Sequence, residues 1–239
     1  MNDYRSDPRG GYAPEQLGVR SAATLSVGFL TQAFVWMFLG LLLSAYVAYL
    51  VQHNTYLAQN VVNLWLPVII VEMVIGIGLQ VAIRRINALM ALGLFFIYAA
   101  LNGLTFGVIL LMVNSAATVV EAFVSAAAMF GGAALYGAVT RRSLANMFGY
   151  LAMATWGLFA ALLVNMFVGN GTLDILISIA SVVIFTALTA STVQRISRGQ
   201  FAAITGSAEK ASVIGALLLY LEFVNIFLFL LRLYGGGRR

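Results

Sequence analysis

Seven long apolar runs, separated by short polar segments, divide most of the chain. A helix needs about 20 apolar residues to cross a hydrocarbon core of about 30 Å, and the runs have about that length. Backbone polar groups inside lipid need partners within the protein, and no run alternates as a barrel strand does. The pattern therefore predicts an all-α integral membrane protein with seven transmembrane helices. The expected helices cover residues 23–51, 64–83, 87–113, 119–140, 144–168, 173–194 and 210–234.

The composition agrees with a membrane protein. Hydrophobic residues make up 62% of the 239 residues and charged residues only 9%, whereas soluble domains carry about 25% charged residues. Because so few charges cannot cover a water-exposed surface, lipid is expected around most of the chain. The absence of cysteine excludes a disulfide framework and a thiolate metal site, and the one histidine, His53, falls in a predicted loop.

Polar segments flank the expected seven-helix transmembrane domain, which extends over residues 23–235. Residues 1–22 contain prolines, glycines and charges, and we expect them to form a flexible cytoplasmic tail. They lack the basic start, short apolar core and small-residue cleavage site of a signal peptide. Residues 236–239 are expected to form a short C-terminal tail.

Basic residues mark alternate connections between the runs. The first, third and fifth connections contain no lysine or arginine, whereas the tail and the other connections do. These basic residues are Arg5, Arg9, Arg20, Arg84, Arg85, Arg141, Arg142, Arg195, Arg198 and Lys210. Since basic residues favour the cytoplasmic side, the pattern predicts a cytoplasmic N-terminus and, after seven crossings, an outer C-terminus. The charges lie in short turns rather than in one patch, so the expected partner is the lipid bilayer and not nucleic acid.

Two acids lie near the centres of expected helices, Glu72 in IIVEMVIGIG and Glu222 in LLLYLEFVNIF. At 1.5 Å per residue, each is on the order of 15 Å from either membrane surface. An ionised carboxylate at that depth is costly unless it finds water or a cation, or takes up a proton. Each acid is therefore a candidate proton switch. The alternative for each is a neutral structural acid, hydrogen-bonded between helices.

Polar residues of the last two runs fall on shared faces. With 3.6 residues per turn, Glu222 and Asn225 lie on one face of the last helix, and Arg232 near its end can extend to the membrane surface. The sixth run carries hydroxyls that either line a wet crevice or bond back to helix carbonyls. These hydroxyl residues are Ser178, Ser181, Thr189 and Thr192.

Small residues in the runs predict close contacts between helices. Ala128 and Gly132 lie four residues apart in the fourth run, and Gly76 and Gly78 leave two positions of the second run without a side chain. Such positions let helix backbones approach each other in lipid. We therefore expect them at helix interfaces, with a regulated hinge as the alternative.

Motifs of enzyme active sites are missing from the sequence. A single loop histidine excludes a Ser-His-Asp triad, and neither HExxH nor GxxxxGK[ST] occurs. A paired-aspartate membrane protease needs two aspartates within spans, whereas Asp174 lies at a helix end. The protein is therefore not expected to be an enzyme.

The last run closely resembles the signature of a known family. ALLLYLEFVNIFLFLLRLYG (216–235) agrees at nearly every position with the last helix of the Bax-inhibitor family of membrane proteins, approximately A-L-x-L-Y-L-D-F-I-N-L-F-x-x-L-L-R. Three other segments look like further helices of this family: LPVIIVEMVIG (66–76), YAALNGLTFGVIL (98–110) and ALTASTVQRI (187–196). The resemblance extends over roughly residues 20 to 235.

The resemblance implies a seven-helix fold in which six helices surround a central seventh. Bacterial members of the family are associated with a pH-sensitive calcium leak across the membrane. In them, one acid of the sixth helix and one of the seventh share a proton and close the pore, and an arginine at the cytoplasmic end of the second helix latches onto that pair. The resemblance also implies a bacterial inner (plasma) membrane location.

Two positions of the implied site can be carried over directly, and one of them departs from the family. The seventh-helix acid is Glu222, a conservative change from aspartate. The sixth-helix acid falls on Thr192, which cannot ionise. The latch falls on Arg84 or Arg85. The resemblance thus implies one central carboxylate in place of a pair of acids.

We therefore expect a pH-modulated calcium (cation) leak channel with Glu222 at its centre. Thr192 and Asn225 are its expected polar neighbours in the ion pathway, and Glu72 is a second acid. Calcium prefers six to eight oxygen ligands, with carboxylates important among them, so Glu222 with hydroxyls and carbonyls makes a weak calcium site. Calcium is the expected transported ion, protons are the expected modulators, and no cofactor is expected.

Two other functions fit the sequence. A non-conducting regulator that binds a membrane protease or another membrane protein is favoured by the loss of the sixth-helix acid. Its docking arm would be the polar tail, so deletion of residues 1–20 should remove function and leave any flux intact. A proton-coupled transporter would need substrate-binding groups at the membrane centre and broken helices, for which the sequence offers only Gly76 and Gly78.

Overall fold

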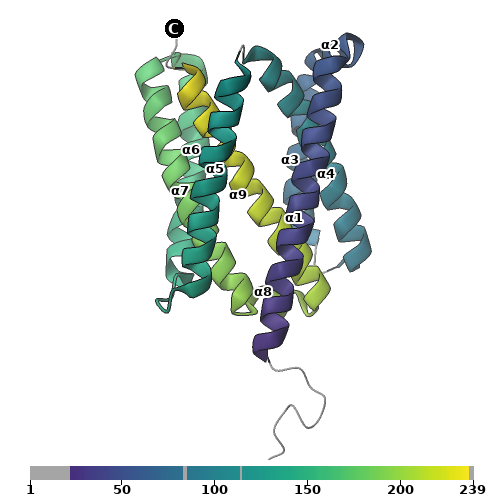
Figure 1. Cartoon of the computed structure of the whole chain (residues 1–239), viewed down its shortest axis with the longest axis vertical. Coiled ribbons are helices and arrows are strands. Elements are labelled where there is room, and N and C mark those ends of the chain that lie inside the picture. Colours follow the sequence, from purple (N-terminus) through teal and green to yellow (C-terminus); the bar gives the residue numbers. More distant parts are fainter. Residues whose placement is uncertain (1–21, 83–84, 114, 237–239) are drawn as a thin grey trace, which may run out of the picture.

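The described part of the chain is a bundle of helices without a strand (Figure 1). The computed structural model describes residues 22–82, 85–113 and 115–236. The helices are α1 (Ala22–His53), α2 (Thr55–Asn63), α3 (Trp65–Ala82), α4 (Ala88–Met112), α5 (Ala116–Val139), α6 (Ala145–Val168), α7 (Gly171–Ser197), α8 (Gln200–Thr205) and α9 (Ala208–Gly236).

Seven of these helices are long and apolar enough to cross a membrane: α1, α3, α4, α5, α6, α7 and α9. They coincide with the seven predicted runs, so the predicted all-α, seven-span architecture is confirmed. The short helices α2 and α8 were not expected as helices and fill the first and last connections. Asn54 begins α2 as a cap, because its side chain accepts a hydrogen bond from the Leu57 N–H at 3.0 Å.

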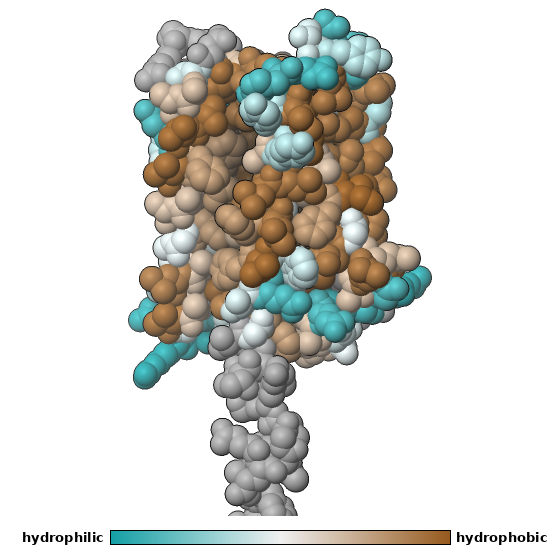
Figure 2. Space-filling model, turned by 45° about the vertical axis from the view of Figure 1, so that its right-hand side comes forward, coloured by the Kyte–Doolittle hydropathy of each residue, from teal (hydrophilic) through white to brown (hydrophobic). Residues whose placement is uncertain are grey.

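The outer surface of the bundle has an apolar middle. Figure 2 shows apolar side chains, in brown, over the middle of the visible face and hydrophilic ones, in teal, gathered toward both ends. Large apolar side chains such as Phe38, Val74 and Phe167 are more than half exposed. Exposing so large an apolar surface to water is unfavourable, so this surface is suited to contact with lipid.

Helix α9 occupies the interior of the bundle. Of its most apolar stretch, 78% is buried in the protein, against 44% or less for every other span. It runs diagonally between two groups of helices (Figure 1) and packs against α1, α4, α5, α7 and α8. In contrast, α3 packs mainly on α4, and α6 mainly on α7. A ring of six helices around the seventh therefore stays a prediction.

Helix α5 lies close against α7 at Gly137. A Cβ atom at this position would collide with the backbone of Ala190. The predicted pair Ala128 and Gly132 is instead exposed, and nothing lies within 4 Å of a Cβ placed on Gly132. That prediction was wrong because α5 is apolar on all sides, so small residues occur on its lipid face as well as on its packed face.

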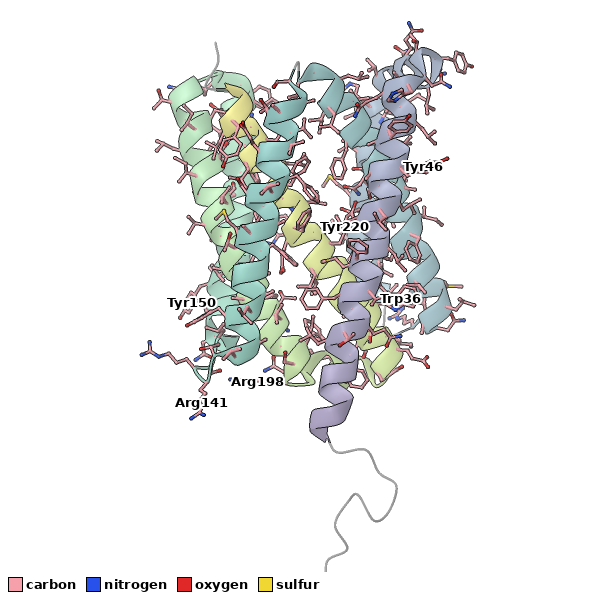
Figure 3. All side chains as sticks on the ribbon, viewed as in Figure 1. Trp36, Tyr46, Arg141, Tyr150, Arg198 and Tyr220 are labelled. Atoms are coloured by element: carbon pink, nitrogen blue, oxygen red, sulfur yellow. The ribbon has the colours of Figure 1, made fainter. Side chains whose placement is uncertain are left out.

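The two ends of the bundle differ in charge. Helix α1 begins at the end opposite to the one where α9 finishes (Figure 1), as an odd number of crossings requires. Arg141 and Arg198 lie at the end where α1 begins (Figure 3). The predicted tail over 1–22 and its arginines fall outside the described residues, apart from Ala22 at the start of α1, and Arg84 also falls outside them.

Candidate functional site

Glu222 lies in the middle of α9 and is buried between helices. Its side chain is 5% exposed, and Thr192 of α7 is fully buried beside it. The Thr192 hydroxyl donates a hydrogen bond of 2.5 Å to Oε1 of Glu222. Its Oε2 atom is buried and has no hydrogen-bond partner. The structure thus brings together the two residues that the sequence analysis placed at the centre of the site.

Three of the four hydroxyls of α7 bond back to their own helix. Ser178 donates to the carbonyl of Asp174 at 2.8 Å, and Ser181 donates to that of Ile177 at 2.7 Å. Thr189 lies within reach of Glu222 but donates its proton to the Phe185 carbonyl at 2.9 Å. The back-bonding alternative therefore holds for these three, and Thr192 is the one of the four that donates its proton to a residue of α9.

Asn225 does not join Glu222. Its side-chain amide donates to the carbonyl of Leu221 one turn earlier in α9, at 2.7 Å. The residue is partly exposed. Asn225 follows Glu222 by about one turn of α9, and the local carbonyl rather than Glu222 is the partner of its amide.

Glu72 belongs to a different part of the bundle. It lies on α3 and accepts a hydrogen bond of 2.6 Å from the Thr105 hydroxyl of α4. Helix α3 packs on α4, on the side of the bundle away from α7 (Figure 1). Each acid is thus bonded to a threonine of a neighbouring helix, and Glu72 is not placed as a second carboxylate for Glu222.

The face of α9 opposite to Glu222 is held by Tyr220. This side chain is fully buried, and its hydroxyl lies 2.7 Å from the Ser44 hydroxyl of α1. Its ring meets Phe95 and Tyr98 of α4 edge to face. Because two residues correspond to a rotation of about 200°, seating Tyr220 against α1 and α4 directs Glu222 toward α7.

Of the two expected latch residues, only Arg85 belongs to the part of the chain that the structure describes, and it forms no ion pair with Glu222. Arg85 is exposed in the turn after α3, and Arg84 lies outside the described residues. The cation that interacts electrostatically with Glu222 is Arg195 of α7. This interaction was not predicted from the sequence, although Arg195 follows Thr192 by three residues and therefore lies near the same face of the helix.

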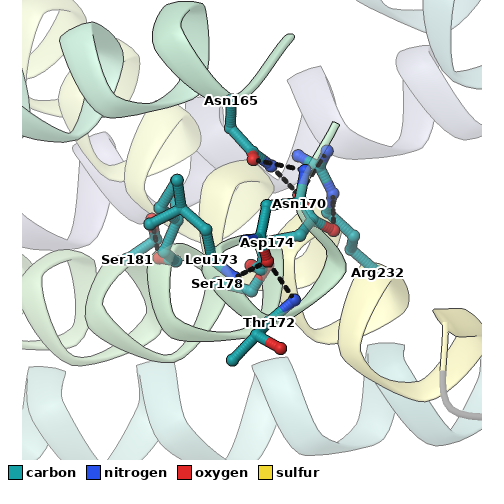
Figure 4. Close-up of polar contacts among 9 residues, drawn as sticks. Asn165, Asn170, Thr172, Leu173, Asp174, Ser178, Ser181 and Arg232 are labelled. Carbon is teal, nitrogen blue, oxygen red and sulfur yellow. Dashed lines mark hydrogen bonds and ion pairs between the residues drawn. The ribbon is translucent and has the colours of Figure 1, made fainter. Parts of the chain in front are cut away.

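An ion pair joins the end of α9 to the start of α7. Arg232 contacts Asp174 through two nitrogens, at 2.7 and 2.8 Å. Asn165 of α6 also donates to Asp174, and Asn170 caps α7 by accepting from two backbone N–H groups (Figure 4). The Arg232 side chain is 47% exposed, so the ion pair contributes about 1 kcal/mol or less. Arg232 does reach the end of the bundle as predicted, and Asp174 is its partner there.

Glu222 lies apart from the other acids of the described chain. Within the described residues, no three His, Cys, Asp or Glu side chains come together to hold an ion. The oxygen that the structure brings closest to the Glu222 carboxylate belongs to a neutral hydroxyl, which is a weak ligand for calcium.

Seven apolar spans with an acid buried at the centre of the innermost one define a polytopic α-helical membrane protein. The chain belongs to the Bax inhibitor family, because its residues 27–239 match the family described as Inhibitor of apoptosis-promoting Bax1. The sequence resemblance to this family is thus confirmed.

Relatives from several bacteria cover nearly the whole chain. A protein of Deinococcus radiodurans is 41% identical over 211 residues, which cover 88% of this chain and 90% of the relative. The inner membrane protein YbhL of Escherichia coli K12 is 36% identical over 217 residues, which cover 88% and 92%. A protein of Borreliella burgdorferi is also 36% identical, over 215 residues that cover 88% and 92%.

Proposed function

We propose that the protein is a pH-modulated calcium (cation) leak channel with Glu222 as its single central carboxylate. The observation that carries the proposal is the buried carboxyl itself. One of its oxygens accepts from Thr192, and the other is buried without a partner. Arg195 acts on this carboxyl without forming an ion pair, so a negative charge at the centre of the innermost helix still favours uptake of a mobile cation or a proton.

The location and orientation belong to the same proposal. The membrane is the inner membrane, in line with the relative YbhL, which is named an inner membrane protein. The N-terminus is cytoplasmic and the C-terminus is outside, because Arg141 and Arg198 lie at the end where α1 begins (Figure 3). The first four helices and α5 to α7 form the two sides of the bundle, and α9 lies between them.

The chemistry proceeds through Oε2 of Glu222. Thr192 donates to Oε1 in either protonation state, so Oε2 is the atom that takes up or releases the proton. Without that proton, the carboxylate attracts a cation into the bundle. With it, the negative charge disappears, and so does the attraction for both the cation and Arg195. Protons thereby change the passage of cations without a second acid.

Glu222→Gln is expected to abolish the pH dependence of calcium flux in proteoliposomes. Glutamine keeps the shape and can still accept from Thr192, but it cannot exchange a proton. Calcium entry should be measured on the acid and alkaline sides of neutral pH. Wild-type flux should differ between the two, and the variant should conduct equally at both. Glu72→Gln is the matched control, since Glu72 is bonded to Thr105 elsewhere, and its pH response should remain. No flux in the wild type, or a pH response that survives in Glu222→Gln, contradicts the leak function.

A non-conducting regulator of another membrane protein is the second candidate. The observation in its favour is that the group facing Glu222 is Thr192, a hydroxyl that keeps its proton. A wild-type protein that is silent at both pH values, together with loss of biological function when residues 1–20 are deleted, would favour this candidate over the channel.

A further inference from the structure

Helix α8 is a short segment folded back between the end of α7 and the start of α9 (Figure 1). Gly199 before it and Gly206 after it both adopt left-handed backbone conformations, with φ of 68° and 67°. Glycine accommodates this conformation without steric cost. Phe201 and Thr205 of α8 are buried. The segment thus packs on the bundle through its buried side chains, and a left-handed glycine connects each of its ends to the neighbouring helix.

Arg195 of α7 is the side chain that ties α8 down. Its guanidinium lies over the ring of Phe201 at 4.6 Å from the ring centre and over Phe148 of α6 at 3.9 Å. Its Nε donates to the side-chain oxygen of Gln200 at 3.3 Å. Stacking of a planar guanidinium between aromatic rings is a favourable cation–π arrangement. One cation therefore connects α6, α7 and α8.

The same cation lies about one helical turn from Thr192, whose hydroxyl binds the central acid. Arg195 also interacts electrostatically with Glu222. The two are not an ion pair, since in the described part of the chain only Arg232 and Asp174 approach that closely. Helix α8 itself, QFAAIT, contributes no charged residue. The positive charge that both contacts α8 and interacts with Glu222 is thus that of Arg195.

We propose that Arg195 is the positioning residue of an inner gate, in which its guanidinium anchors α8 over the end of α7 and presents a positive charge toward Glu222. The gating role rests on the proposed leak function, whereas the anchoring does not. While Arg195 holds α8 in place, its charge repels cations that approach Glu222, and α8 covers the end of α7. When Arg195 releases α8, the helix rotates away about Gly199 and Gly206, and neither the charge nor α8 blocks the cations any longer.

Cysteine labelling tests the anchoring directly, because the chain has no cysteine of its own. Thr205→Cys places a thiol on the buried face of α8, and a water-soluble maleimide reports how often that face opens. In lipid nanodiscs both membrane faces are accessible, so the orientation does not matter. Adding Arg195→Gln should speed the labelling about tenfold, as expected for the loss of two cation–π contacts. Arg195→Lys keeps the charge but loses the planar stacking, so its labelling rate should fall between the two.

Matched variants separate anchoring from a general loss of charge or of folding. Arg198→Gln removes an exposed arginine three residues later and should leave the labelling of Thr205→Cys unchanged. Ala203→Cys lies on the exposed face of α8 and should react rapidly whether or not Arg195 is present. Phe201→Leu keeps the arginine and removes one ring, so it should also speed labelling and serves if Arg195→Gln fails to fold.

Calcium flux through the same variants tests the gate. Arg195→Gln should raise flux relative to wild type, and Arg198→Gln should not. Labelling of Thr205→Cys that is unaffected by both Arg195→Gln and Phe201→Leu overturns the anchoring and with it the gate. Faster labelling without increased flux, in a wild type that conducts, overturns the gate alone. Faster labelling with no flux in any sample supports the anchor and rejects the leak function.

Discussion

Gly137→Val is expected to leave little folded protein in the membrane. The Cβ atom of any other residue at this position collides with the backbone of Ala190 on α7, and backbone cannot move aside as a flexible side chain can. Helices α5 and α7 would have to separate, which removes packing that lipid does not replace. Gly137→Ala should already lower the free energy of unfolding by about 2 kcal/mol, in the range for overpacked cores. The yield of monodisperse protein after detergent extraction, and its melting temperature, measure the effect.

Gly132→Val provides the matched control for this prediction. Gly132 lies on the same helix, is exposed, and has nothing within 4 Å of its expected Cβ. Its substitution should change the stability by less than about 0.5 kcal/mol. Equal losses at the two positions would show that helix propensity, rather than the contact with Ala190, sets the requirement for glycine.

Thr192→Asp is expected to replace the single pH transition of calcium flux by two. The new carboxyl would stand where the threonine hydroxyl now donates to Glu222 at 2.5 Å. Once one of two carboxyls so close has ionised, its charge opposes ionisation of the other, so the pair loses its protons in two macroscopic steps. The steps should be separated by more than about one pH unit. Flux into proteoliposomes across a series of pH values measures them.

The melting temperature of the Thr192→Asp variant as a function of pH gives a second readout that does not require conduction. Thr192→Asn is the control, since its amide is polar and of similar size but does not ionise, and its profile should keep one step. A Thr192→Asp profile that matches the wild type would mean that the two side chains do not share the environment seen in the structure.

Much of the fold follows from the length of the apolar runs. Each span was predictable because a helix must hold its own backbone hydrogen bonds in lipid. The short helix α2 was not predictable in this way, since its residues are too few and too polar to register as a span. The same applies to α8, whose boundaries are set by the conformations of Gly199 and Gly206.

Which face of each helix is packed could not be derived from apolarity. In water an apolar stripe marks the core, but in lipid both the packed and the exposed faces are apolar. Ala128 and Gly132 were therefore assigned to an interface that Gly137 actually makes.

The polar contacts show a similar limit of sequence analysis. The pairing of Glu222 with Thr192 followed from the family resemblance, because that pattern assigns both positions to one site. The partner of Glu72, Thr105, lies on another helix and carries no signal in spacing. Arg195 could have been considered from its place one turn after Thr192, but its stacking between Phe148 and Phe201 depends on tertiary structure.

The contacts on opposite faces of α9 constrain how that helix can move. Tyr220 holds it to α1 on one face, and Glu222 holds it to α7 on the other. Turning the helix about its own axis would break both contacts at once, so the motion that remains is a change of tilt about a fulcrum near residues 220–222. A tilt about this point displaces the two ends of α9 most, and in opposite directions. At these ends α9 is restrained by α8 on one side of the bundle and by the ion pair of Arg232 with Asp174 on the other.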